Sequence, residues 1–238
     1  MQFEPLIRAI AQQYETFATP RPLDVEGCEC CTTPEELAAL VAVPREQLSA
    51  AALDFYARKA LTTVGDQIEF RYFWPRLAEL AIAGEFETDR EVVFGKPHYG
   101  EDQTWPTVEQ NALVDLARAL GQWLGAEPFE ESEVSEWVCS IGLLVEGLAD
   151  VRPFLSPILE PTSTASANLA AFIGWNRPDI ETKGRLSNAF WQSAPQSAAA
   201  VLEWYSSDAR VQDAIYAMDL ESAKLYGTPM PIRRHTRG

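Results

Sequence analysis

The stretch of residues 134–148, VSEWVCSIGLLVEGL, decides the fold class of this chain. Its apolar residues recur at spacings of three and four, which is the period of one face of an α-helix. This face is unusually wide, and such a width is typical of a central helix that is covered from several sides. The residues that form it are Val134, Trp137, Val138, Ile141, Leu144, Val145 and Leu148. The stretch therefore predicts a central α-helix.

The helical period continues on both sides of this stretch. We expect helices at about residues 3–17, 34–41, 49–64, 66–83 and 113–124 before it, and at about 164–175, 195–206 and 208–226 after it. A short helical piece is expected among three prolines near residues 153–161, and an irregular segment at 176–195. Apart from one short strand that could form at residues 91–94, no alternation typical of strands is present. The pattern predicts an all-α protein.

Residues at the expected helix ends support these boundaries. Thr33 and Glu36 have the spacing of a capping box, and Ser49 and Asp66 are typical N-cap residues. Gly65 can end one helix just before Asp66 begins the next. These signals place the starts of three helices in the first third of the chain.

Pro75 lies inside the helix expected at residues 66–83. A proline within a helix removes one backbone hydrogen bond and clashes with the preceding turn. We therefore expect a kink or a break near Trp74.

Residues 84–106 are the longest stretch without a helical period, and we expect one long irregular loop there. A loop of this length is usually functional or a boundary. We expect paired antiparallel helices in a single domain, residues 1–230, which the loop can divide into halves at 1–83 and 107–230. A solenoid-like stack is one arrangement of these pairs, although no repeat of fixed period is present. Residues 231–238 are expected to form a basic tail.

The composition describes an acidic globular protein. Of the 238 residues 47% are hydrophobic, and 35 acidic against 19 basic residues give a net charge of −16. The hydrophobic content excludes disorder of the whole chain. A negative surface repels phosphate backbones and anionic lipids, so we expect binding neither to nucleic acid nor to a membrane surface. Such a surface serves solubility, or it attracts a basic protein partner.

We expect neither a membrane-spanning segment nor a signal peptide in this chain. Its apolar runs are too short to span a bilayer, and its first residues lack the basic and apolar regions of a signal peptide. We expect a cytoplasmic protein, in which thiols stay reduced.

Three of the four cysteines, Cys28, Cys30 and Cys31, lie within four residues just before the capped helix at 34–41. Such a cluster can bind a metal, respond to redox state, or be buried as packing. Thiolate ligands favour zinc or copper(I). A tetrahedral zinc site needs a fourth ligand, and His98 in the long loop is the best candidate. The fourth cysteine, Cys139, is expected to be a buried small residue.

The sequence gives little support for conventional catalysis. The chain has two histidines, and His235 lies in the expected tail, so a catalytic triad or a Cys–His pair could use only His98. Phosphate-binding loops, dinucleotide-binding turns and the HExxH motif are not present in the sequence. Acidic residues flank the long loop, but nearby acids are common in a chain of this charge. We therefore expect a protein that is not an enzyme.

A second segment of interest, rich in aromatic and charged residues, contains Arg71, Trp74 and Arg76. The two arginines can pair with Glu69 and Glu79 on the helix surface. If either arginine is buried beside Trp74 instead, the three residues become a candidate site for an anionic ligand or a partner.

The cysteine cluster and the segment around Arg71, Trp74 and Arg76 resemble those of a bacterial family of soluble helical proteins that has no assigned activity. The family features are a CxCC cluster and an FxxFxPRLxEL segment. The resemblance covers about residues 28–80, and it implies that these two segments form one shared unit, with no catalytic residues to transfer. The matching residues are Cys28, Cys30, Cys31, Thr62, Gly65, Asp66, Phe70, Phe73, Pro75, Arg76, Leu77, Glu79 and Leu80.

Two functional hypotheses follow from the sequence. The first is an acidic, non-enzymatic helical scaffold that binds a protein partner, which its charge suggests is basic. The second is a metal-binding or thiol-sensing protein that uses the Cys28, Cys30 and Cys31 cluster. An enzyme that acts through His98 or the loop acids has the weakest support.

Overall fold

The computed structural model describes residues 3–99 and 105–226. Within these ranges the chain forms eleven α-helices and four short 3-10 helices. The described residues contain two isolated β-bridges, but they form no strand. The prediction of an all-α fold is confirmed.

The chain divides into two compact units, residues 1–119 and 120–238. The division falls inside helix α6 (Thr107–Ala126). The expected boundary at residues 84–106 lies closer to the N-terminus, within the first unit. The basic tail expected at 231–238 lies outside the described residues.

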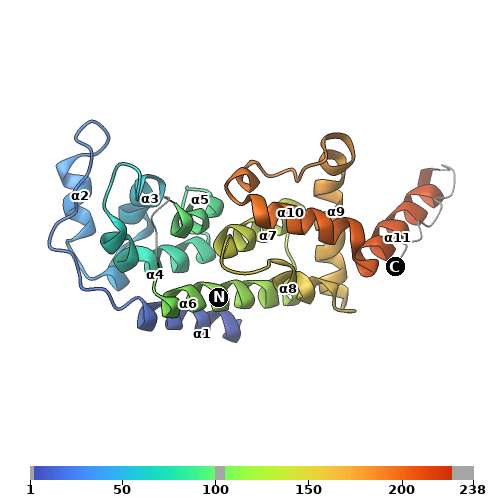
Figure 1. Ribbon diagram of the computed structural model, residues 1–238, viewed down its shortest axis with the longest axis horizontal. Coiled ribbons are helices and arrows are strands. Elements are labelled where there is room, and N and C mark those ends of the chain that lie inside the picture. Colours follow the sequence, from blue (N-terminus) through green and yellow to red (C-terminus); the bar gives the residue numbers. More distant parts are fainter. Residues whose placement is uncertain (1–2, 100–104, 227–238) are drawn as a thin grey trace. The chain divides into compact units, whose positions relative to one another are not determined.

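Unit 1 is built around α4 (Gln67–Ala83), against which α1 (Glu4–Thr16), α3 (Ala50–Lys59) and α5 (Arg90–Gly95) pack (Figure 1). The short helix α2 (Pro34–Leu40) contacts α3. The unit has an aromatic core whose rings meet mainly edge to face or tilted, an arrangement that adds to the stabilisation from burial alone. The fully buried aromatic side chains in this core are Phe17, Tyr56, Phe70, Phe73, Trp74 and Phe94.

Helix α4 runs through Pro75 without interruption, so the expected break near Trp74 does not occur. Pro75, Phe73 and Leu77 are all buried in the core of unit 1. Burial of several large apolar side chains stabilises the helix by more than the hydrogen bond that the proline removes.

The predicted helix starts are confirmed. Thr33 accepts from the backbone of Glu36 and closes a capping box, and Ser49 caps α3. Asp66 caps α4 through a second capping box. Helix α3 ends at Lys59 rather than near residue 64, because the chain then turns tightly and Leu61 takes a positive φ of 64°.

The prediction of one long irregular loop at 84–106 is wrong for residues 90–98, and residues 100–104 of that stretch lie outside the described residues. Helix α5 and the 3-10 helix η2 (Lys96–His98) lie there, and the residues expected as a short strand are helical. Val93 and Phe94 of α5 are buried. A helix of six residues is too short to show a period in sequence and forms here by packing against α3 and α4.

Arg45, in the 3-10 helix η1 (Arg45–Gln47), is a buried cation of unit 1 with an exposed fraction of 6%. Its guanidinium donates to the backbone oxygens of Phe17 (2.6 Å), Tyr72 (3.0 Å) and Tyr14 (3.0 Å). It also lies 5.2 Å from the ring centres of both tyrosines. The charge is thus compensated by carbonyl oxygens and aromatic rings as well as by the exposed carboxylate of Glu46.

Unit 2 is built around α7 (Glu131–Val145), the helix predicted from the widest apolar face. Every residue from Trp137 to Val145 is buried. Around it lie α9 (Ser163–Lys183), α10 (Pro195–Ser207) and the 3-10 helix η4 (Ala189–Ser193) (Figure 1). The unit also contains α8 (Arg152–Leu155), the 3-10 helix η3 (Ser156–Leu159) and α11 (Ala209–Tyr226), which packs on α9 and α10. The prediction of a central helix is confirmed.

The expected irregular segment at 176–195 is wrong in its first half, because α9 continues through Pro178 to Lys183. It ends at Gly184, whose φ of +65° is readily adopted only by glycine. The buried side chain of Asn176 accepts a hydrogen bond from the backbone of Ser187 and holds the following segment. A solenoid-like stack of helix pairs stays a prediction.

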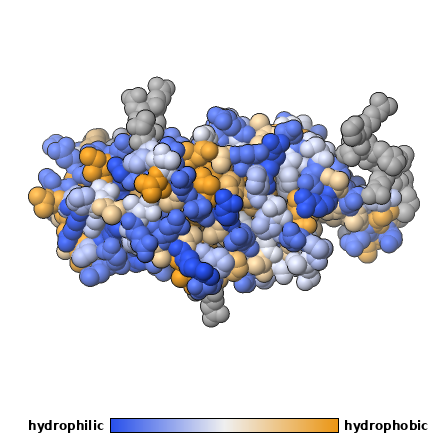
Figure 2. All heavy atoms as spheres, turned by 60° about the horizontal axis from the view of Figure 1, so that its bottom comes forward, coloured by the Kyte–Doolittle hydropathy of each residue, from blue (hydrophilic) through white to orange (hydrophobic). Residues whose placement is uncertain are grey.

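None of the described helices is both long and apolar enough to cross a membrane. On the face shown in Figure 2, hydrophobic residues lie among hydrophilic ones, which cover most of that face.

Candidate metal centre

The three clustered cysteines lie on residues 27–32, which we call the cysteine turn. The backbone amides of Cys31 and Thr32 donate to the carbonyl oxygen of Cys28 at 2.8 Å and 3.0 Å. The hydroxyl of Thr32 donates to the same oxygen at 3.0 Å. These bonds close the turn on itself through its backbone and the Thr32 hydroxyl.

The cysteine turn is held against the loop of residues 60–65, which joins α3 to α4. The backbone amide of Cys28 donates to Thr63 O at 2.8 Å, and that of Gly65 donates to Glu26 O at 2.8 Å. An antiparallel bridge between Gly27 and Val64 lies between these bonds. Two segments that are distant in sequence are therefore joined by main-chain hydrogen bonds, like a short piece of sheet.

Two lysines fix the 60–65 loop and the turn. Lys59 Nζ donates to the carbonyl oxygen of Cys31. Lys96 is 6% exposed, and its Nζ donates to Arg58 O (3.0 Å) and Ala60 O (2.8 Å) at the C-terminal end of α3. A cation stabilises the carbonyl oxygens that a helix leaves unpaired at this end. Burial nevertheless lowers the pKa of Lys96 to about 8.

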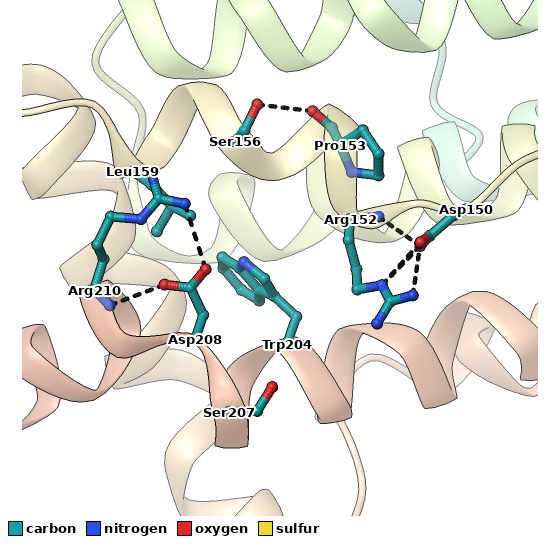
Figure 3. A pocket seen from close by; sticks show the side chains of 9 residues that line it. All are labelled: Asp150, Arg152, Pro153, Ser156, Leu159, Trp204, Ser207, Asp208 and Arg210. Carbon is teal, nitrogen blue, oxygen red and sulfur yellow. Dashed lines mark hydrogen bonds and ion pairs between the residues drawn. The ribbon is translucent and has the colours of Figure 1, made fainter. Parts of the chain in front are cut away.

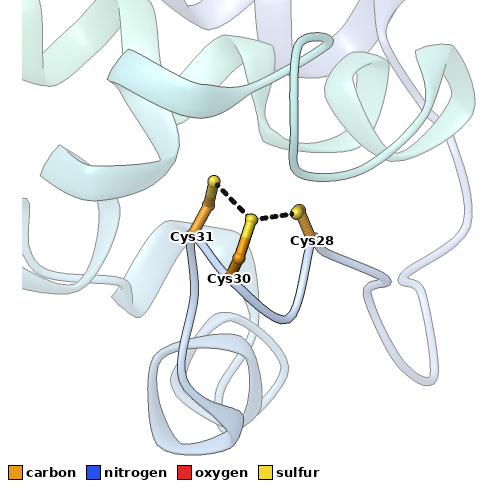
Figure 4. Close-up of side chains that lie close together, drawn as sticks. All are labelled: Cys28, Cys30 and Cys31. Carbon is orange, nitrogen blue, oxygen red and sulfur yellow. Dashed lines mark hydrogen bonds between the residues drawn. The ribbon is translucent and has the colours of Figure 1, made fainter.

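The three sulfur atoms point to the same side of the turn and toward one another (Figure 4). The Sγ atoms of Cys28 and Cys30 are 2.8 Å apart, and those of Cys30 and Cys31 are 3.4 Å apart. All three lie within 4.8 Å of one another. Cys28 and Cys30 are exposed and Cys31 is partly exposed, so the cluster does not fill a core.

The thiols of the cluster differ in acidity. Hydrogen bonds from the side chain and the backbone of Cys30 lower the pKa of Cys28. Hydrogen bonds with Cys28 and Cys31, together with the charges of these neighbours, raise the pKa of Cys30 to about 11. Cys28 is therefore the first of these two thiols to become a thiolate, which is the form that binds metals and attacks electrophiles.

The arrangement fits a thiophilic metal ion. Zinc bound by thiolates at about 2.3 Å in tetrahedral geometry needs sulfur atoms about 3.8 Å apart. The separations of 2.8 Å and 3.4 Å would therefore have to widen by about 1 Å at most when zinc binds. The three cysteines can thus hold a metal ion.

The structure does not bring His98 into this group. Among the described histidines, cysteines and acids, the cluster of mutually close ligand atoms contains the three cysteines alone. His98 ends η2, and Glu29, although it lies between two of the cysteines, is likewise not a member. Cys139 is fully buried in α7 of unit 2, as expected. His235 lies outside the described residues.

Arg71, Trp74 and Arg76 have structural partners. Arg71 pairs with the buried Glu109 of α6, rather than with Glu69, which is engaged in the capping box of α4. Trp74 is fully buried and its Nε1 donates to Gln13 at 3.0 Å.

Arg76 pairs with Glu79 at 2.7 Å, as the sequence suggested, and also donates to Leu48 O at 2.9 Å. Glu79 in turn accepts from the hydroxyl of Tyr14 at 2.6 Å. Like the pairing of Arg71, this pairing compensates the charge within unit 1.

Unit 2 carries a pocket of about 360 Å³ that the sequence did not indicate. Trp204 lies between two ion pairs, Arg152 with Asp150 and Arg210 with Asp208 (Figure 3). The lining combines the end of α10, the start of α11 and the α8–η3 segment, so no local motif could have predicted it. Both arginines are already paired with carboxylates, which weakens any attraction for an anion.

The fold and the site together describe an all-α protein with a surface cluster of three thiols. Comparison of the chain with known protein families, curated proteins and solved structures finds no match. The resemblance to the helical family stays a prediction.

Proposed function

We propose that this protein binds a thiophilic metal ion, zinc or copper(I), through the thiolates of Cys28, Cys30 and Cys31. The observation that carries the proposal is the convergence of three sulfur atoms, all on at least partly exposed residues, within 4.8 Å on a turn that backbone hydrogen bonds close. A preformed ligand set of this kind lowers the cost of ordering the site when the ion binds. The proposal assumes a reducing compartment such as the cytoplasm.

Two other interpretations of the cluster are a packing role and a redox role. Cysteines that serve as packing are buried, as Cys139 is, whereas these three are at least partly exposed. A redox role would use a reversible disulfide between Cys28 and Cys30, whose sulfur atoms are the closest pair. The third nearby thiol is what favours metal binding, because a disulfide needs only two.

The expected binding of a basic protein partner stays a prediction. It rests on the net charge of −16, and no feature of the described surface favours it over a role in solubility.

Native mass spectrometry of protein purified under reducing, oxygen-free conditions tests the proposal. We expect a mass excess of one zinc or copper ion, lost in Cys30→Ser and kept in Cys139→Ala, the matched control in unit 2. At a free metal concentration of 100 times the dissociation constant, the ion should stabilise the wild type by about 2.7 kcal/mol. A metal-free wild type that also gains no thermal stability from either ion would contradict the proposal.

A further inference from the structure

The cysteine turn offers three protein ligands and leaves any further coordination position open. Within residues 3–99 and 105–226, no histidine, acid or fourth cysteine joins the cluster. Zinc prefers four ligands, so in this site it would need water or another molecule to complete its shell. An ion whose valence is filled by three thiolates needs no fourth ligand.

The charge around the turn also distinguishes between ions. Glu29 lies on the turn, Glu26 and Glu35 flank it in sequence, and Lys59 is the cation that contacts it. Three thiolates carry three negative charges, so copper(I) leaves the complex with a charge of −2 and zinc leaves it with −1. A trivalent centre leaves no charge. Among neighbouring carboxylates, the neutral complex avoids repulsion between like charges.

We propose that the cysteine turn is a three-coordinate site for trivalent arsenic, which enters as arsenous acid and is held by Cys28, Cys30 and Cys31. This inference rests on the proposed function because it uses the same three thiols. Arsenous acid is uncharged at neutral pH, so the acidic surface does not repel it. The exposure of the cluster gives it direct access.

The binding step is a condensation without a change of oxidation state. Each thiol sulfur forms one As–S bond, and one As–OH bond breaks. The thiol proton leaves with that hydroxide as water, so As(OH)₃ and three thiols give As(SR)₃ and three waters. No oxidant or reductant is needed, and arsenic keeps its lone pair where a fourth ligand would otherwise bind.

The test compares arsenite, which can form three bonds to sulfur, with phenylarsine oxide, which can form two. Affinities are measured by calorimetry under reducing, oxygen-free conditions for the wild type, the three single Cys→Ser variants and Cys139→Ala. Loss of the third intramolecular bond should weaken arsenite binding on the order of a hundredfold in each single variant. Phenylarsine oxide should still bind those variants, because two thiols within 4.8 Å remain. Cys139→Ala should match the wild type with both probes.

The outcomes separate this inference from the proposed function. If zinc or copper(I) binds and arsenite does not, or if arsenite binds equally well to wild type and single variants, the three-coordinate arsenic site is overturned and the metal proposal stands. If zinc, copper(I) and arsenite all fail to bind, both the proposed function and the arsenic site are wrong. X-ray absorption of the arsenite complex should show three sulfur neighbours of arsenic, and an oxygen neighbour would overturn three-thiol ligation.

Discussion

The cysteine turn and helix α4 belong to the same unit, and opposite kinds of interaction hold them. In the turn, backbone bonds such as Cys28 N to Thr63 O fix the shape, and the cysteine side chains are at least partly exposed. In α4, Phe70, Phe73 and Trp74 are fully buried, and their packing holds the helix in place. The comparison suggests that side chains of the turn can change with little effect on the fold, whereas those of α4 cannot.

The largest effect is expected from Trp74→Ala at the centre of α4. Truncating a buried tryptophan should reduce the free energy of unfolding by about 3–5 kcal/mol. The change also removes the donor to the buried Gln13 Oε1. Urea denaturation measures the loss, with Trp74→Phe as a control that keeps most of the volume. A loss below that of the control would contradict the central role of this side chain.

A smaller loss is expected at Lys96, whose Nζ holds the C-terminal end of α3 just before the loop that supports the cysteine turn. Lys96→Met removes the donors to Arg58 O and Ala60 O and should reduce stability by about 1–3 kcal/mol at pH 7. It should also weaken metal binding, because Ala60 is the first residue of the 60–65 loop that holds the turn. An unchanged metal affinity would show that the position of the 60–65 loop does not affect the metal site.

Lys96 also predicts a dependence on pH. Its pKa is about 8 in the folded protein, below the value of about 10.4 expected for an unfolded chain. Between these values the unfolded state binds more protons, so this group makes stability rise with pH. Denaturation at pH 7.5 and 9.5 should therefore show the wild type gaining stability relative to Lys96→Met. An equal response of both proteins would contradict the lowered pKa.

The buried Cys139 and the exposed Cys30 can be compared directly by the effect of the same substitution on stability. Cys139→Ser places a hydroxyl in the fully buried environment of α7 and should reduce stability by about 1–3 kcal/mol. Cys30→Ser should leave the melting curve of the metal-free protein unchanged, because its side chain is exposed. Differential scanning calorimetry of both variants measures this. A clear loss in Cys30→Ser without metal would mean that its sulfur supports the turn.

The smallest expected effect is at Glu69, the N3 residue of α4. Burial, with repulsion from Asp66, Asp24 and Glu26, raises its pKa above 4.5. Since the folded state binds this proton more tightly, the group's contribution to stability declines as pH rises through the raised pKa. Glu69→Gln should therefore stabilise the protein at pH 7, by only a few tenths of a kcal/mol because of solvent screening, and not at pH 4. Denaturation at both values tests this; a gain at pH 4 would contradict it.

Local signals predicted most of the fold, and long-range contacts determined what they missed. Capping at Thr33, Ser49 and Asp66 and the period of α7 involve residues a few positions apart, so the sequence displays them directly. Helix α5 forms through burial against other helices, and no short window of sequence contains that information.

The sequence predicted the ligands of the site but not the residues that hold these ligands in place. The spacing of the three cysteines predicted a cluster, and the structure brings their sulfur atoms together. The support from Thr63 and Lys96 joins segments about 30 or more residues apart, and neither residue carries a motif. The pairing of Arg71 with Glu109 was missed for the same reason.

The buried Arg45 has a consequence for how unit 1 opens. Its guanidinium binds the carbonyl oxygens of Tyr14 in α1, of Phe17 just after α1 and of Tyr72 in α4, so separating these segments would remove several partners of a buried charge. The end of α1, η1 and the middle of α4 should consequently open as one cooperative unit. In native-state hydrogen exchange, their amide protons would share a single opening free energy despite their separation in sequence.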